Sequence, residues 1–393
     1  MTTAKNFVNF HVLISHSPSC LNRDDMNMQK TALFGGVKRV RISSQSLKRA
    51  MRTSPYYAAK LGIPSVRTLK LDKLRIKFQA KLAGRFEPAV IDQTLALLAG
   101  TEGIAEGAET SAVAPWSLDE VAFFCERVAA AQAEGVDAKK LEKEIEKNAR
   151  PFRAALAGAV DIALSGRMAT SGLMTSLPVD GALALAHAIT THAVEPQDVD
   201  WFTAVDDLKQ EEHDPGAGHL NTQEFSAGVF YRYASLNLKQ LQVNLGLIDD
   251  IHSPETPESR AQALEIAKHL LHLLATVVPS AKRQPFAADN LAEFAVVSFS
   301  DMPVSLANAF EKPVKRAGAS GGYLAPSQRV MAGYWEKLNR AYGLEERAAA
   351  FCFDDAPWTE ENKGTSATPW PEGLPALASL PALENWIAAD GQA

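Results

Sequence analysis

The sequence is poor in cysteine: its 393 residues include only Cys20, Cys125 and Cys352, and none of them stands in a CxxC pair. Widely spaced cysteines of this kind predict neither a disulfide framework nor a zinc cluster. No apolar run approaches the roughly 20 residues that a membrane-spanning helix needs. The first residues also lack the basic and then apolar layout of a signal peptide. We therefore expect a globular, cytoplasmic chain with no membrane attachment.

Acidic residues are scarce in the first part of the chain. Residues 1–85 contain 17 Lys and Arg but only three acids, Asp24, Asp25 and Asp72. This segment carries a net charge of +14, whereas the remaining residues carry −20. Such a one-sided distribution predicts that the basic part faces a polyanion such as nucleic acid. A solvated basic surface is the alternative.

The periodicity of apolar residues predicts a mixture of strands and helices. Expected strands cover 7–15, 37–42, 160–164 and 294–299, and two further β-like arms, 199–205 and 224–238, enclose a polar stretch. Expected helices cover 70–83, 87–99, 117–133, 137–157, 180–193, 257–277 and about 303–312. Strands separated by helices predict an α+β fold, for which a ferredoxin-like RNA-recognition sheet with a helical insertion is a natural candidate. The proline-rich segment beyond residue 355 is expected to be an extended edge segment.

The segment 37–52 has the composition of a phosphate-binding site. Arg39 and Arg41 share one face of the predicted strand, and the helix that follows can be capped by Ser43 or Ser44. Free N–H groups at the start of a helix attract phosphate. The side chains expected to contact nucleic acid here are Arg41, Ser43, Ser44, Gln45, Lys48, Arg49 and Arg52. An ordinary capped amphipathic helix is the alternative.

Two further segments could contact nucleic acid. Arg167 and Met168 lie between glycines, where Arg can pair with phosphate and Met can pack against a base. A purely structural turn is the alternative there. Trp201 and Phe202 are adjacent on the first β-like arm, and either could stack on a base or fill the core.

Catalytic signals are weak. Asp24 and Asp25, beside Arg23, could support phosphodiester cleavage, although paired loop acids are usually only solvated. Two histidine pairs lack a third metal ligand: His269 with His272, and His213 with His219. We therefore expect no catalytic residue, no metal and no cofactor.

Five segments resemble the backbone subunit of the type I-E CRISPR Cascade complex, the CasC family. They are residues 10–25, 39–51, 163–172, 200–207 and 222–233. The likeness covers most of the chain up to about residue 345. It implies a non-enzymatic subunit that binds the CRISPR guide RNA, lines up with further copies of itself along that RNA and joins other Cascade subunits in antiviral defence. It also implies that the guide is presented for pairing with a target DNA strand.

The resemblance implies a hand-shaped architecture. Its expected parts are a palm (1–57), helical fingers (58–155), a web with the Gly-Arg-Met loop (156–194), a β-hairpin thumb (195–224), the second part of the palm (225–355) and a tail rich in Pro and Trp (356–393). Guide contacts are implied for Arg23, Ser43, Gln45, Lys48, Arg52 and Met168. The thumb residues implied to act on the RNA are Trp201, Phe202, Thr203, Val205 and Leu220.

Some features depart from the family pattern. A lysine row on the fingers implies DNA contact by Lys139, Lys140 and Lys143, but Glu146 interrupts the row. Residues 248–259 look like a small insertion. Two alternatives stay open: a guide-dependent endoribonuclease that uses Asp24 or Asp25, and a stand-alone RNA-binding module.

Overall fold

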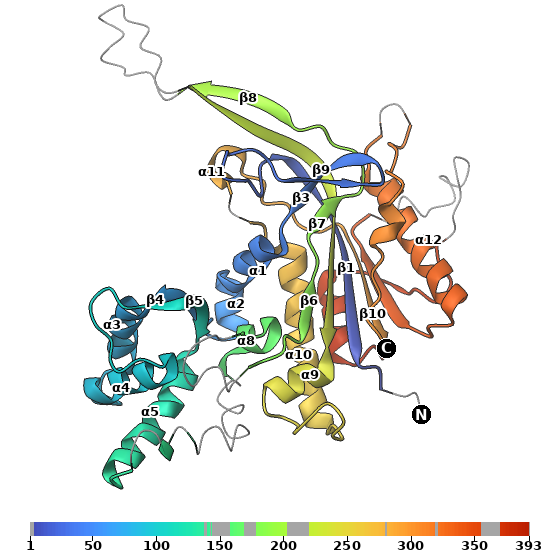
Figure 1. Ribbon diagram of the computed structural model, residues 1–393. Coiled ribbons are helices and arrows are strands. Elements are labelled where there is room, and N and C mark those ends of the chain that lie inside the picture. Colours follow the sequence, from blue (N-terminus) through green and yellow to red (C-terminus); the bar gives the residue numbers. More distant parts are fainter. Residues whose placement is uncertain are drawn as a thin grey trace, which may run out of the picture. The chain divides into compact units, whose positions relative to one another are not determined.

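In the computed structural model (Figure 1), the chain forms two compact units. Unit 1 comprises residues 1–51, 185–235 and 268–393, and unit 2 comprises residues 52–184 and 236–267. The structure describes residues 4–136, 140, 141, 143, 158–168, 178–202, 220–279, 281–318, 321–354 and 370–392. Among these residues, no helix is long and apolar enough to cross a membrane.

Unit 1 is built on a mixed sheet, which has ten strands in the described part of the chain. Its main path runs β12-β11-β10-β1-β9-β7-β3-β2, and β6 and β8 pair with β9 outside that path. The strands are β1 (Phe7–Ser19), β2 (Thr31–Phe34), β3 (Val37–Ile42), β6 (Leu183–Leu185), β7 (Ala188–Thr190), β8 (Gln197–Phe202), β9 (Leu220–Asn237), β10 (Phe294–Ser300), β11 (Arg347–Cys352) and β12 (Ala376–Leu377). Strands β11 and β12 pair in parallel, whereas β1 and β10 are antiparallel, with Phe7 opposite Ser300.

Both faces of the central strands are covered. On one face, Tyr231 and Val296 pack with Met331 and Trp335 of α12 (Leu324–Tyr342). On the other face, Phe299 meets the Trp386 ring of α13 (Leu380–Ala388) edge-on, with ring centroids 5.4 Å apart. The remaining helical elements with residues in unit 1 are α1 (Ser44–Arg52), α10 (Pro257–Thr276), α11 (Arg283–Phe286) and the 3₁₀ turn η4 (Ala307–Phe310). This covering explains why β10 is buried at every position.

Unit 2 has its own apolar core, to which Phe78, Leu95, Trp116 and Phe124 contribute. Its elements are α2 (Pro55–Lys60), β4 (Val66–Lys70), α3 (Leu71–Leu82), α4 (Pro88–Ala99), β5 (Glu109–Trp116), α5 (Leu118–Ala133), α8 (Val160–Ser165) and α9 (Leu238–Asn244). Strands β4 and β5 pair with each other in a separate two-stranded sheet.

Several expected elements are confirmed and several are wrong. Strands β3 and β10 and helices α3, α4, α5 and α10 lie within about a residue of their expected bounds. The expected strand 160–164 is helix α8, because this short segment is buried at all five positions and shows no face by which to tell the two apart. The expected helix 180–193 is replaced by β6 and β7, because pairing with β9 overrides the helix propensity of its Ala and Leu. The expected helix 303–312 is reduced to η4. Residues 137–139, 142 and 144–157 of another expected helix lie outside the described residues.

Candidate nucleic-acid interface

Three side chains from separate segments fix the start of α1. The Asn22 Oδ1 accepts the Ser43 N–H at 2.8 Å, and the Ser43 hydroxyl accepts the Ser46 N–H at 3.3 Å. Ser43 therefore caps the helix as expected. The Ser44 N–H donates to His187 Nδ1 at 2.8 Å, which links the start of α1 to the residue directly before β7.

Helix α1 buries one face and offers the other to solvent. Leu47 and Met51 are buried, whereas Gln45 and Arg49 are exposed and lie four residues apart on one side. Lys48 is half-buried, and the first turn contains no acidic residue. The exposed face therefore presents amide and cationic groups with no carboxylate beside them in the first turn.

The neighbouring loop and strand place two of the other expected arginines in unit 1. Arg41 is half-buried, and its Nε donates to the Thr31 carbonyl oxygen at 3.1 Å. Arg23 is exposed, and its guanidinium donates to Asn27 Oδ1 within the loop. The Glu224 carboxylate accepts the Gln29 N–H at 2.8 Å, which ties this loop to β9.

Arg39 corrects the expectation that both arginines of the strand are presented together. It is fully buried, and its guanidinium donates to the carbonyl oxygens of Thr190 at 3.0 Å and Phe310 at 2.8 Å. Burial lowers the pKa of this guanidinium, and the Glu311 carboxylate opposes that shift. Arg39 is thus a structural cation of unit 1.

Two expected contacts lie in unit 2 and are already engaged there. Arg52 donates to the Ser65 carbonyl oxygen at 2.9 Å. Arg167 is 4% exposed, and its Nη1 lies 2.6 Å from the Glu120 carboxylate. The expected phosphate contact of Arg167 is contradicted, because a buried carboxylate already pairs with this guanidinium. Arg52 keeps a half-buried side chain.

The turn before Met168 needs its glycine. Gly166 has a φ of 77°, and a side-chain carbon there would lie 2.7 Å from the Val179 carbonyl oxygen. This close approach lets Arg167 pair with Val179 as an isolated antiparallel bridge. Met168 follows directly and is 86% exposed, which places an apolar side chain in solvent.

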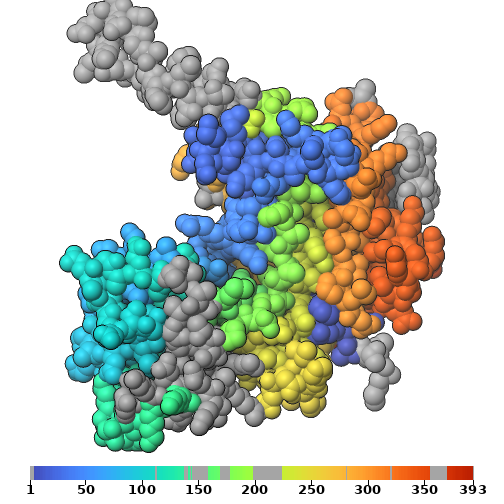
Figure 2. Space-filling model, viewed as in Figure 1, coloured from blue at the N-terminus to red at the C-terminus, as the bar shows by residue number. Residues whose placement is uncertain are grey.

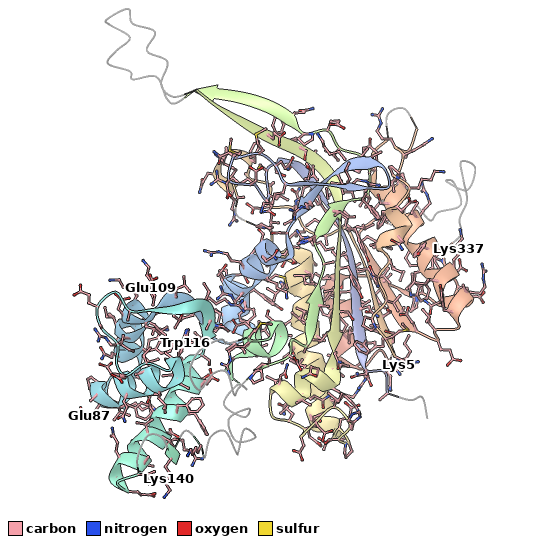
Figure 3. All side chains as sticks on the ribbon, in the orientation of Figure 1. Lys5, Glu87, Glu109, Trp116, Lys140 and Lys337 are labelled. Atoms are coloured by element: carbon pink, nitrogen blue, oxygen red, sulfur yellow. The ribbon has the colours of Figure 1, made fainter. Side chains whose placement is uncertain are left out.

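The two β-like arms form an antiparallel ribbon. Strand β8 pairs with β9 from Gln197 opposite Phe225 to Phe202 opposite Leu220, and Trp201 stands opposite Asn221. Figure 1 shows this ribbon extending away from the main path of the sheet. Three expected contacts, Thr203, Val205 and Lys139, lie outside the described residues. Lys140 (labelled in Figure 3) and Lys143 are exposed in unit 2.

Asp24 organises its own loop. Its Oδ1 accepts the N–H groups of Met26 at 2.9 Å and Met28 at 3.0 Å, which forms an Asx-type turn. No group of three or more His, Cys, Asp or Glu that could hold a metal occurs among the described residues. His272 instead pairs with Glu384 at 2.9 Å, joining α10 to α13.

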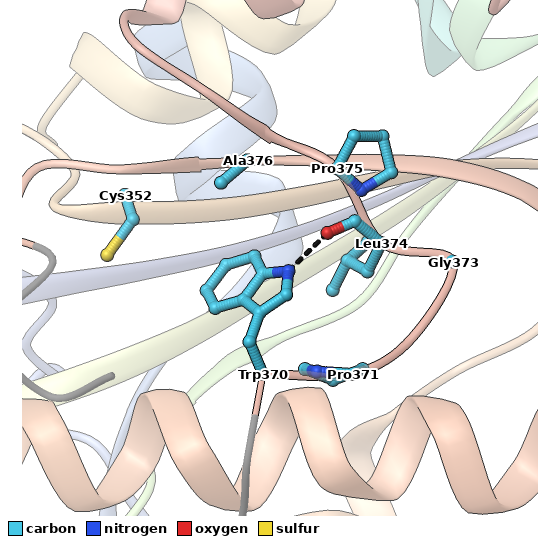
Figure 4. A pocket seen from close by; sticks show the side chains of 7 residues that line it. All are labelled: Cys352, Trp370, Pro371, Gly373, Leu374, Pro375 and Ala376. Atoms are coloured by element: carbon cyan, nitrogen blue, oxygen red, sulfur yellow. Dashed lines mark hydrogen bonds between the residues drawn. The ribbon is translucent and has the colours of Figure 1, made fainter. Parts of the chain in front are cut away.

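A cavity of about 530 Å³ lies near the carboxyl-terminal edge of the sheet. It is lined by Cys352, Trp370, Pro371, Gly373, Leu374, Pro375 and Ala376, and the Trp370 N–H donates to the Leu374 carbonyl oxygen (Figure 4). The Cys352 thiol donates to the Asp354 carbonyl oxygen at 2.8 Å. These largely apolar walls offer no pair of groups for acid–base chemistry.

Sequence reasoning missed several residues of this region. Asn22 and His187 hold the first amides of α1, and neither stands in a pattern that predicts such a role. Lys312, Lys315 and Arg316 form a second exposed basic group in unit 1. A charge count over short windows would have found this group within the acidic remainder of the chain.

Comparison with known proteins places the fold among CRISPR components. A family model described as CT1975-like protein (Cas_CT1975) matches residues 8–377. A chain of a solved "CRISPR RNA-guided surveillance complex, pre-nicking" is 26% identical, with a TM-score of 0.75 over 98% of this chain and 100% of that one. A chain of another "CRISPR RNA-guided surveillance complex" shares the fold at 23% identity, with a TM-score of 0.65 over 98% of this chain and 99% of that one. No curated protein matches.

Proposed function

The chain belongs to the CT1975-like protein family, and on that premise we propose that it binds CRISPR guide RNA as a subunit of a surveillance complex of the type I-E Cascade kind. The observation that carries the proposal is the exposed polar and basic face at the start of α1, in a chain similar along its length to one from an RNA-guided complex. Hydroxyl, amide and cationic groups beside a helix start suit phosphate and ribose oxygens.

The proposed contacts fall into two groups. In unit 1, the RNA backbone would meet Arg23, Arg41, Ser44, Gln45, Lys48 and Arg49, with Ser43 holding the helix start. In unit 2, the exposed Met168 would pack against a base, and Lys140 and Lys143 would approach the target DNA strand. The β8–β9 ribbon would act as the thumb that interrupts the RNA at Trp201, Phe202 and Leu220. Several copies would align along one guide and present it for pairing with target DNA.

We assign the protein a holding role rather than a catalytic one. The Asp24 carboxylate, the best candidate for a nuclease, accepts two backbone N–H groups of its own loop. Guide pairing can supply sequence recognition while the protein holds the shape of the strand. Regularly spaced cuts in a complementary RNA, made by the guide-loaded complex with Mg²⁺, would contradict this assignment.

The test compares two double variants with the same change in charge. Lys48→Gln/Arg49→Gln removes two cations from α1, and Lys337→Gln/Arg340→Gln removes two exposed cations from α12. We expect the α1 variant to bind guide RNA at least 10-fold more weakly, because it loses two phosphate contacts. The slope of log affinity against log salt should fall by about 1.4.

The α12 variant should bind guide RNA like the wild type. Affinity is measured by fluorescence anisotropy at several salt concentrations, and circular dichroism checks folding. If both variants lose the same affinity, net charge rather than the α1 site governs binding. If the wild-type protein is indifferent to guide RNA in dilute buffer, the proposed function is wrong.

A further inference from the structure

A second basic group lies between η4 and α12 in unit 1. Lys312, Lys315 and Arg316 are all exposed within five residues. In the part of the chain that the structure describes, none of them has a carboxylate partner within 4 Å. This group stands in the portion of the sequence that is otherwise strongly acidic. Three cations so close together repel one another and attract a polyanion.

The backbone holds this group in place. Val314, between two of the cations, is buried, and its N–H donates to the Thr191 carbonyl oxygen at 3.0 Å. The Ala317 N–H donates to the Gly322 carbonyl oxygen at 3.1 Å. Before the loop, the Phe310 carbonyl accepts from the buried Arg39. The cations are therefore carried by a backbone that is anchored on both sides.

The basic group of Lys312, Lys315 and Arg316 lies near the first end of β3, and the exposed face of α1 follows the other end of this strand. At the first end, a side-chain carbon on Gly35 would collide with the Glu311 carbonyl oxygen, so the β2–β3 turn touches the start of the basic loop. At the other end, β3 runs into α1. A strand of six residues spans about 17 Å. In Figure 2, blue atoms of the β2–β3 region adjoin orange atoms of the part of the chain that contains residues 312–316.

The surface between the two groups is not uniformly basic. Lys38, on β3, is paired with the exposed Glu195 carboxylate at 3.5 Å. Glu311 adds a second exposed acid directly before Lys312. A single strand that followed β3 from one group to the other would pass these acids.

We propose that Lys312, Lys315 and Arg316 hold the phosphodiester backbone of a second nucleic-acid strand, namely DNA, while α1 holds the guide. This inference rests on the proposed function. Each cation that meets a phosphate releases a counterion, and no carboxylate of the described residues has to be displaced from these three side chains. The contact reads no bases, so it acts on DNA of any sequence.

The test uses the full chain assembled on guide RNA, and its probe is duplex DNA of roughly 30 base pairs unrelated to the guide. Lys315→Gln/Arg316→Gln is compared with Lys337→Gln/Arg340→Gln, which also removes one Lys and one Arg. Lys337 (Figure 3) is 13 residues into α12, about 20 Å along the helix from its start. Guide RNA affinity is measured first, and DNA affinity is then measured at several salt concentrations.

We expect Lys315→Gln/Arg316→Gln to keep guide affinity within about two-fold and to bind duplex DNA at least 10-fold more weakly. The salt slope for DNA should fall by about 1.8. The control variant should keep both affinities.

The inference is overturned if DNA binding is unchanged, if both variants weaken equally, or if guide binding falls together with DNA binding. If the wild-type chain does not bind guide RNA, the proposed function is refuted instead.

Discussion

Buried polar side chains determine much of unit 1 at the scale of single residues. His11 Nδ1 and the Tyr231 hydroxyl share a hydrogen bond of 2.9 Å, and that hydroxyl also accepts the Leu306 N–H at 3.0 Å. His16 Nε2 accepts from the Arg232 guanidinium at 3.3 Å. Both imidazoles are buried. Burial lowers the pKa of each to about 3, and Arg232 contributes to the shift of His16.

These histidines predict that the protein loses stability in acid. An unfolded histidine titrates near 6.5, so between pH 6.5 and 3 the unfolded chain binds more protons than the folded one. The free energy of unfolding is then fully maintained above about pH 6.5. Below it, each histidine removes about 1.4 kcal/mol per pH unit. Urea denaturation at pH 7.5, 6 and 5 measures this slope.

His11→Gln keeps a hydrogen-bonding side chain beside Tyr231 but cannot titrate. We expect this variant to be less stable than the wild type at pH 7.5, and to lose less stability between pH 6 and 5. His252→Gln, at an exposed histidine, is the control and should leave the slope unchanged. An identical pH slope for all three proteins would show that His11 titrates normally in the folded state.

At single residues, some features could be predicted from the sequence and others could not. The alternation of β3 placed Arg39 and Arg41 on one face, and the cap at Ser43 follows from hydroxyl chemistry. The burial of Arg39 did not follow, because the carbonyl groups that cover it belong to Thr190 and Phe310. Contacts so distant along the chain leave no local pattern in the sequence.

At the scale of elements, one added side-chain carbon in the β2–β3 turn should change the stability of the protein. Gly35 and Gly36 have φ values of 60° and 76°, which glycine adopts readily. Gly36→Ala meets open space, so it should cost about 1–2 kcal/mol of unfolding free energy from backbone strain alone. Gly35→Ala should cost more, because it adds a collision with the Glu311 carbonyl oxygen.

Thermal denaturation of the two variants measures this difference. Gly35→Ala should also weaken duplex DNA binding, since it displaces the backbone that carries Lys312. Equal losses of stability in the two variants would mean that the backbone at Glu311 moves away from the added carbon at no cost in unfolding free energy.

Elements with a clear apolar face were predictable and the others were not. Helices α3, α4, α5 and α10 follow the three-to-four spacing of their apolar residues, and β3 follows its alternation. Helix α8 is buried on all sides and therefore shows no periodicity. Strands β6 and β7 have three residues each, and their pairing with β9 determines their conformation. Strands β4 and β5 fall within a segment where helices dominate the pattern.

At the scale of the whole molecule, the proposed function makes a prediction about stoichiometry. If copies contact each other head to tail along one guide, the number of copies per RNA should rise with RNA length. Native mass spectrometry with guides of two lengths measures this number. One copy per RNA at both lengths would favour the stand-alone RNA-binding module.

The pairing of β1 with β10 has a consequence for biosynthesis. Phe7 pairs with Ser300 and Leu13 with Phe294, so β1 leaves the ribosome long before its partner strand β10 is made. At about 5–20 residues per second, that delay is roughly 15–60 s. Throughout this delay, a mostly buried strand lacks one of its neighbours, and a nascent chain halted before residue 290 would keep that edge unpaired. Until β10 has been made, the edge of β1 that pairs with it therefore carries unpaired backbone N–H and C=O groups.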